Sequence, residues 1–155
     1  MLSREAKVVS NDQLHIVAVT GFLYRKDGKF LILKRSEKEI AQPGMWTVPG
    51  GKVEKGCSIL KTLEREIKEE TDLETTGIFK FIGDSEFTRP DGYHVVIPRF
   101  LCEAKDGEVN IQKEDFTDYA WIILDELDNY DLIPGVKKEL QEIKNNNFIN
   151  QKERQ

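Results

Sequence analysis

The sequence of 155 residues is poor in cysteine and histidine and contains no long apolar run. Cys57 and Cys102 are the only cysteines and show no CxxC spacing, so neither a disulfide framework nor a zinc site is expected. The longest apolar runs, such as 31–33 and 95–97, are far too short to span a bilayer. No N-terminal stretch has the charged and then apolar layout of a secretory signal. We therefore expect a cytoplasmic protein without a membrane partner.

Basic charge is also in short supply. The chain has 23 Lys and Arg against 28 Asp and Glu, a formal net charge of −5. Binding to a nucleic-acid polymer needs a basic surface, so such a partner is not expected. A small phosphorylated ligand remains compatible, because a divalent cation can lie between protein carboxylates and substrate phosphates.

Length and composition predict one domain. Hydrophobic residues are 39% and charged residues 33%, which is a globular balance, and 155 residues leave no room for two ordinary domains. We expect a single domain over 1–155, with 1–12 and 148–155 as loose ends. The sequence leaves a monomer and a homodimer equally open.

Apolar, β-branched segments alternate with turn signals and predict an α/β (α+β) fold. The almost continuously apolar stretch 15–24 reads as a strand covered on both faces, joined to the next strand by an Asp-Gly turn. Gly83 is expected at a bulge, and Pro98 at an edge or bulged position. Strands are predicted at 15–24, 30–35, 45–48, 75–88, 93–102 and 119–124, and helices at about 59–71 and from Pro134 to about 145–147.

A glycine-rich loop with Gly50, Gly51 and Gly56 leads into the first of these helices. Glycine can adopt backbone angles closed to other residues and lets a ligand or metal approach the main chain. Ser58 is the expected N-cap of the helix, and Asp72 stands where a left-handed residue is expected after its last turn.

Three glutamates gather on one side of this helix. Leu60, Leu63 and Ile67 form an apolar stripe, and the glutamates at 66, 69 and 70 fall in a single arc beside it. Several carboxylates in one place suit Mg²⁺ or Mn²⁺. A solvated acidic face is the alternative, since like charges at helical neighbours cost only about 0.2–0.5 kcal/mol per pair. The preceding glycine loop and the neighbouring Arg65 favour the metal site.

This segment resembles the signature of the Nudix hydrolase family, G-x5-E-x7-R-E-U-x-E-E-x-G-U, in which U is a bulky apolar residue. The sequence departs from it at two positions, with Cys57 in place of the first Glu and Asp72 in place of the last Gly. The approach 46–51 and the chain length are most similar to the MutT-like group. The resemblance implies an α/β/α sandwich with a mixed sheet between helices. The residues in register are Gly51, Arg65, Glu66, Ile67, Glu69, Glu70 and Leu73.

The resemblance also implies a reaction. Water attacks a phosphorus of the pyrophosphate bridge in a nucleoside diphosphate linked to a further group, with Mg²⁺ or Mn²⁺ neutralising the crowded oxygens. Glu66 is the candidate that orients or deprotonates the water. Arg65 would orient the carboxylates, although an ordinary surface salt bridge is the alternative. The implied metal ligands are Glu66, Glu69, Glu70 and the Gly50 carbonyl.

Further residues are candidates for metal or substrate contacts. Relatives recruit another acid from beyond the sheet, and Glu114, Asp115 and Asp118 are candidates here, with an exposed loop as the alternative. Trp46 and Phe87 are of a type that stacks on a base, but a place in the core is the stronger interpretation. His15 and His94 lack ligand spacing and are expected to be ordinary strand residues. The candidate substrate contacts are Arg35, Trp46, Gly50, Gly51 and Lys52.

The leading hypothesis is a MutT-like pyrophosphohydrolase that converts a nucleoside triphosphate to the monophosphate and pyrophosphate. ADP-ribose and dinucleoside polyphosphates are the alternative substrates within the same chemistry. Cys57 leaves two interpretations open, because a thiol cannot supply the charge of the family's Glu. It either slows turnover, by the 10–100-fold or so typical of outer-shell changes at metal sites, or marks a nucleotide sensor that binds without turnover.

Overall fold

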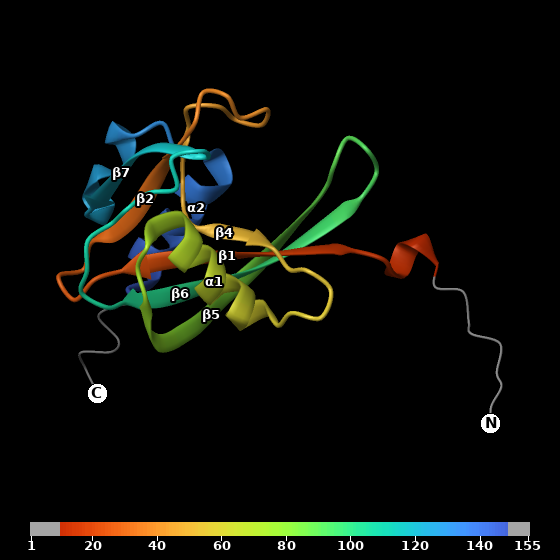
Figure 1. Cartoon of the computed structure of the whole chain (residues 1–155), viewed down its shortest axis with the longest axis horizontal. Coiled ribbons are helices and arrows are strands. Elements are labelled where there is room, and N and C mark those ends of the chain that lie inside the picture. Colours follow the sequence, from red (N-terminus) through yellow and green to blue (C-terminus); the bar gives the residue numbers. More distant parts are fainter. Residues whose placement is uncertain (1–9, 149–155) are drawn as a thin grey trace.

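The first two strands are apolar on both faces, and each face meets a different helix. Successive side chains of a strand point to opposite faces. In β1 (Ile16–Tyr24), Phe22 therefore joins the cluster that contains α2 (Pro134–Asn146), and Leu23 joins the cluster of α1 (Ile59–Thr71). The computed structural model describes residues 10–148. Figure 1 shows α1 and α2 on opposite sides of the sheet. The predicted α/β/α sandwich is confirmed.

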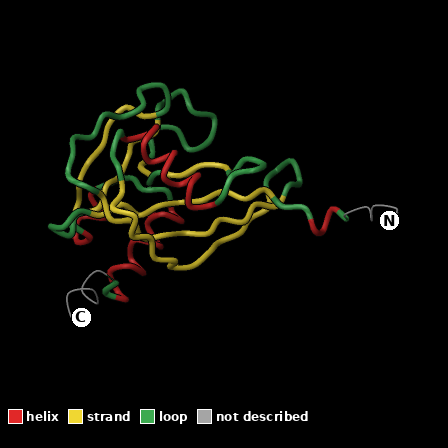
Figure 2. Tube along the Cα trace, turned by 60° about the horizontal axis from the view of Figure 1, so that its bottom comes forward, coloured by secondary structure: helices red, strands yellow, loops and turns green. Residues whose placement is uncertain are grey.

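The sheet is mixed and has seven strands. Its main path runs β3–β2–β1–β6–β5, while β4 pairs with β1 and β7 with β2. The pair β1–β6 is parallel, and the other pairs are antiparallel. Figure 2 shows the long strands side by side, with the 3-10 helix of 11–13 beyond the end of the sheet. The remaining strands are β2 (Phe30–Arg35), β3 (Trp46–Thr47), β4 (Gly50–Lys52), β5 (Thr75–Thr88), β6 (His94–Ala104) and β7 (Phe116–Ile122).

β1 and β2 separate soon after their hairpin, and this separation positions the glycine segment. The two strands pair at Tyr24 and Phe30, next to the turn. Farther along, β1 pairs with β4, and Thr20 lies opposite Gly50. The segment that the sequence predicts as a loop is therefore partly a strand. Its main chain is fixed in the sheet directly beneath α1.

Two other strand predictions need correction. β6 lies inside the sheet between β1 and β5, so of the two positions expected for Pro98, edge or bulged, the edge position is wrong. Pro98 pairs with Asp84 of β5, close to a register shift between Phe81 and Gly83. Gly83 is thus at a bulge, as predicted. β7 begins at Phe116, three residues earlier than expected, which places Asp118 within the strand.

The ends of α1 are capped as the sequence predicts. The Ser58 hydroxyl accepts from the Lys61 N–H at 3.2 Å. Asp72 is left-handed at φ 63°, and its N–H donates to the Lys68 carbonyl. Its carboxylate contacts Lys68 Nζ at 2.8 Å and Asn110 Nδ2 at 3.1 Å. These contacts offset part of the cost of a non-glycine residue in this conformation.

The predicted loose ends fall mostly outside the described residues, at 1–9 and 149–155. Within the described part, 11–13 forms a 3-10 helix and Phe148 packs against the cluster of α2. None of the helices between residues 10 and 148 combines the length and apolarity needed to cross a membrane.

Candidate active site

Gly50 and Gly51 are required because other groups approach them closely. A Cβ at Gly50 would lie 2.4 Å from the Val19 carbonyl oxygen of the paired strand, and a Cβ at Gly51 would lie 2.5 Å from Glu66 Cδ. The expectation of unusual backbone angles is met by Gly56, at φ 85°, and not by these two glycines. The second glycine therefore provides the space that the Glu66 carboxylate occupies against the main chain.

Glu70 is the buried member of the acidic cluster. It is 8% exposed, and its Oε2 accepts from the Gly50 N–H at 3.2 Å. Burial, and then the charge of Glu66, raise its pKa to about 9, while the hydrogen bond from Gly50 opposes the shift. A carboxylate in this place is costly unless a cation accompanies it.

Glu66 and Glu69 interact with Arg65 in different ways. Burial raises the pKa of Glu66. The charge of Arg65 lowers this pKa, and the charge of Glu69 raises it. Arg65 Nη1 lies 3.2 Å from Glu66 Oε1 and 3.2 Å from Glu69 Oε1. The Glu69 side chain is half-exposed and the Glu66 side chain is largely buried. The guanidinium thus contacts both carboxylates, and the orienting role expected for Arg65 stays a prediction.

The carboxylate oxygens of this cluster are donors of the type that a hard divalent cation prefers. Within residues 10–148 no three His, Cys, Asp or Glu side chains converge on one point, and Glu69 is held by Arg65. Glu66 and Glu70, however, act on each other and both have a raised pKa, so two carboxylates share a site with too little positive charge. A divalent cation with oxygen ligands would remove that repulsion.

The further acid that reaches this cluster is Asp115. Its charge helps to raise the pKa of Glu70, and its carbonyl accepts from the Ser36 N–H at 2.8 Å. Glu114 is exposed in the adjoining loop, and the Asp118 carboxylate accepts from the Tyr119 N–H at 2.8 Å. The sequence places all three acids before the same strand, and only the path of the loop over α1 distinguishes them.

The candidate substrate contacts are scattered. Arg35 donates to the Ala41 carbonyl at 3.1 Å and to Glu39 at 3.2 Å, so its guanidinium is engaged by the loop that follows β2. Trp46 packs against the cluster of α2 with its ring edge-on to Tyr130 at 5.1 Å. These contacts agree with the interpretation of Trp46 as a core residue.

Lys52 directly follows the glycine pair in β4. It is exposed at the end of β4 and lines a pocket of about 440 Å³ together with His15 and Lys55. Glu54 lines the same pocket, so its charged residues are two lysines and one glutamate beside the start of α1. Phe87 is exposed on β5, which disagrees with the core position expected for it.

Cys57 is exposed, one residue before the N-cap. It is the smallest of the influences that act on the pKa of Arg65. A carboxylate at this position would add negative charge on the side of the helix start that Arg65 faces, so the departure from the family signature is expected to affect Arg65.

The sequence treats His15 and His94 as unrelated strand residues, whereas the structure places their rings in contact. Only the parallel pairing of β1 with β6 reveals this, because the two residues are 79 positions apart. No local spacing rule covers a pair of this kind.

A layered α+β fold with a glycine pair beneath a helix of carboxylates defines a class of phosphoanhydride-cleaving enzymes. The family model described as NUDIX domain matches residues 14–143. The nucleoside triphosphatase NudI of Escherichia coli K12 is 34% identical over 128 residues, which cover 77% of this chain and 90% of NudI. This chain belongs to the Nudix family. It is a Nudix hydrolase that acts on nucleoside diphosphate derivatives.

Solved structures share the fold. The MutT protein of Methanosarcina mazei Go1 superposes with a TM-score of 0.72 at 24% identity, covering 86% of this chain and 95% of that protein. The Nudix domain of Shewanella oneidensis NrtR, complexed with ADP ribose, gives a TM-score of 0.72 at 17% identity and covers 92% and 93%. At these identities the likeness concerns the fold.

Proposed function

We propose that this chain is a nucleoside triphosphate pyrophosphohydrolase that releases a nucleoside monophosphate and pyrophosphate. The observation that carries the proposal is the pair Glu66 and Glu70 held against Gly50 and Gly51, with a raised pKa on both carboxyls. The name of NudI, a nucleoside triphosphatase at 34% identity, supports the substrate class.

The roles follow from the contacts. Glu66, Glu69 and Glu70, with the Gly50 carbonyl, would hold Mg²⁺ or Mn²⁺, which when bound neutralises phosphate oxygens and acidifies water. Glu66 lies against Gly51, where an added Cβ would be 2.5 Å from its Cδ, and is the candidate for orienting the attacking water. Arg65 keeps Glu66 and Glu69 in place through its two contacts at 3.2 Å. The acid supplied by the loop before β7 is Asp115.

ADP-ribose is the second candidate substrate, because the NrtR Nudix domain of the same fold was crystallised with it. The experiment is to measure phosphate and pyrophosphate release with Mg²⁺ or Mn²⁺ from nucleoside triphosphates, ADP-ribose and dinucleoside polyphosphates. Glu69→Gln is the test variant and Glu64→Gln, an exposed glutamate of the same helix, is its control. Turnover of triphosphates that is lost only in Glu69→Gln supports the proposal. Tight nucleotide binding without turnover in the parent would instead identify a sensor.

The same assay tests the departure at Cys57. Cys57→Glu places a carboxylate beside Arg65, and we expect turnover to rise by about 10–100-fold, the range typical of outer-shell changes at metal sites. Cys57→Ser has the size of the thiol and no charge, and should leave turnover as it is. A parent-like rate in Cys57→Glu would contradict the assigned role of this position.

A further inference from the structure

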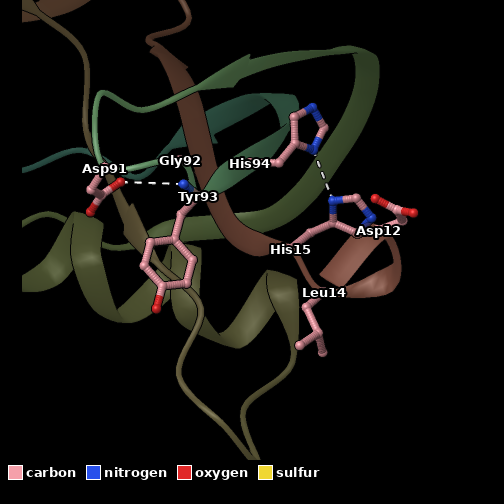
Figure 3. Close-up of a pocket in the computed structure, with 7 residues that line it drawn as sticks. All are labelled: Asp12, Leu14, His15, Asp91, Gly92, Tyr93 and His94. Atoms are coloured by element: carbon pink, nitrogen blue, oxygen red, sulfur yellow. Dashed lines mark hydrogen bonds between the residues drawn. The ribbon is translucent and has the colours of Figure 1, made fainter. Parts of the chain in front are cut away.

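The pairing of β1 with β6 brings the two histidines of the chain together. Ile16, the first residue of β1, lies opposite Val95, so the residues that precede them in the sequence, His15 and His94, are neighbours. Their Nδ1 atoms are 2.8 Å apart, and the rings meet edge-on with centroids at 4.9 Å. Figure 3 shows the two ring nitrogens pointing toward each other, and both rings line a pocket of about 620 Å³.

A carboxylate of the third strand orients one of these rings. Glu86 of β5 contacts His94 Nε2, on the side of the ring away from His15. If that nitrogen carries the proton, His94 Nδ1 presents its lone pair toward His15. A carboxylate on the far nitrogen of a histidine is the usual partner of a metal-binding imidazole, because it fixes the tautomer and the ring orientation.

The geometry is close to that of two imidazoles on one ion. Two metal–nitrogen bonds of about 2.0–2.1 Å place the nitrogens about 2.8–3.4 Å apart at angles between square and tetrahedral. The present 2.8 Å separation lies at the short end of this range, and the rings have room to move outward, since His15 is exposed and His94 partly so. The Asp12 carboxylate lies beside the His15 ring on the same pocket (Figure 3), which offers an oxygen donor.

We propose that His15 and His94 form a site for a divalent transition metal of the Zn²⁺, Ni²⁺ or Cu²⁺ class, with Glu86 as the positioning residue. Imidazole nitrogens favour these ions, whereas the glutamates of α1 favour harder ones. Within residues 10–148 no group of three His, Cys, Asp or Glu side chains is placed to hold a metal, so the site has two protein ligands and is open toward the pocket that Asp12 also lines. A bound ion would tie the start of β1 to the β5–β6 hairpin. The inference does not depend on the proposed function.

The test is a Zn²⁺ titration by calorimetry on the untagged full chain, in excess Mg²⁺ so that the glutamates of α1 are already occupied. The parent should bind one Zn²⁺, and His94→Ala and His15→Ala should each weaken binding at least 10-fold. Glu86→Gln should weaken it by about 10-fold, the lower end of outer-shell effects, while Glu69→Gln should leave it unchanged. Parent with Cu²⁺ should show coupling to two nitrogens by electron paramagnetic resonance, and His94→Ala to one.

Several results would overturn the inference. These are the absence of Zn²⁺ binding by the parent in excess Mg²⁺, unchanged binding in His94→Ala with a native circular-dichroism spectrum, and loss of binding in Glu69→Gln alone. Retention of full affinity in Glu86→Gln would remove the positioning role and leave the two ligands.

Discussion

The burial of Glu70 predicts that the metal-free protein loses stability as the pH rises. A carboxyl of ordinary pKa 4.5 is raised here to about 9 by burial and by the charge of Glu66. Between these values the folded chain keeps a proton that the unfolded chain releases, so the free energy of unfolding falls with rising pH. At about 1.4 kcal/mol per pH unit, the change from pH 6 to pH 8 is about 2–3 kcal/mol for this group.

Glu70→Gln should remove this dependence. The amide carries no charge, and its oxygen can still accept from the Gly50 N–H. Urea unfolding at pH 6, 7 and 8 in a chelator compares the parent with this variant and with Glu64→Gln, which is exposed on the same helix. We expect the parent and Glu64→Gln to lose about 2–3 kcal/mol more than Glu70→Gln over this range.

The reasoning is refuted if the three proteins show parallel slopes, because Glu70 would then be ionised in the folded chain at neutral pH. The same series with saturating Mg²⁺ provides a second check. A bound cation requires the ionised carboxylate, so binding should release a proton near pH 7, and calorimetry in buffers of different ionisation enthalpy measures that release.

Two further predictions concern the close contact at Gly51 and the buried ion pair of Arg99. Gly51→Ala places a Cβ 2.5 Å from Glu66 Cδ and must displace that carboxylate, so kcat should fall about 10–100-fold with little loss of stability. Steady-state kinetics measures kcat, and urea unfolding measures stability. An unchanged kcat would contradict the assigned contact. Glu139→Gln is tested at pH 8, above the pKa of about 7 that burial gives Glu139. It replaces the carboxylate at 2.6 Å from the buried Arg99 by a neutral amide, which leaves the Arg99 charge uncompensated and should cost about 3–5 kcal/mol in unfolding free energy. The matched variant Glu142→Gln removes a half-exposed carboxylate at 4.0 Å and should cost less than about 1 kcal/mol; equal losses in the two variants would argue against the buried pair.

The sequence predicts those parts of the fold that depend on local patterns. The helix at 59–71, its cap at Ser58 and the left-handed Asp72 follow from spacing and capping rules, and all three are found. Strand pairing is different, since it depends on partners far along the chain. Local rules place Pro98 at an edge or a bulge, and only the strand order shows that its strand lies inside the sheet, close to the register shift of β5.

The candidate site likewise has features that local patterns predict and features that they do not. The spacing of the signature predicts which glutamates share a helix face, but not that Glu70 is buried while Glu69 is half-exposed beside Arg65. That difference depends on how β4 and the loop before β7 cover the helix. The contact between the two histidines is beyond any local pattern, because it needs the register of β1 against β6.

The parallel neighbour of β1 also has a consequence for synthesis of the chain. The pairing of Ile16 with Val95 joins residues that emerge from the ribosome far apart in time. The hairpin of β1 and β2 and the helix α1 can form early from local contacts, but one side of β1 stays without its partner until β6 has been made. Such non-local pairing slows folding and leaves apolar edges exposed meanwhile. Nascent chains that end before His94 should therefore need protection from aggregation that the finished chain does not.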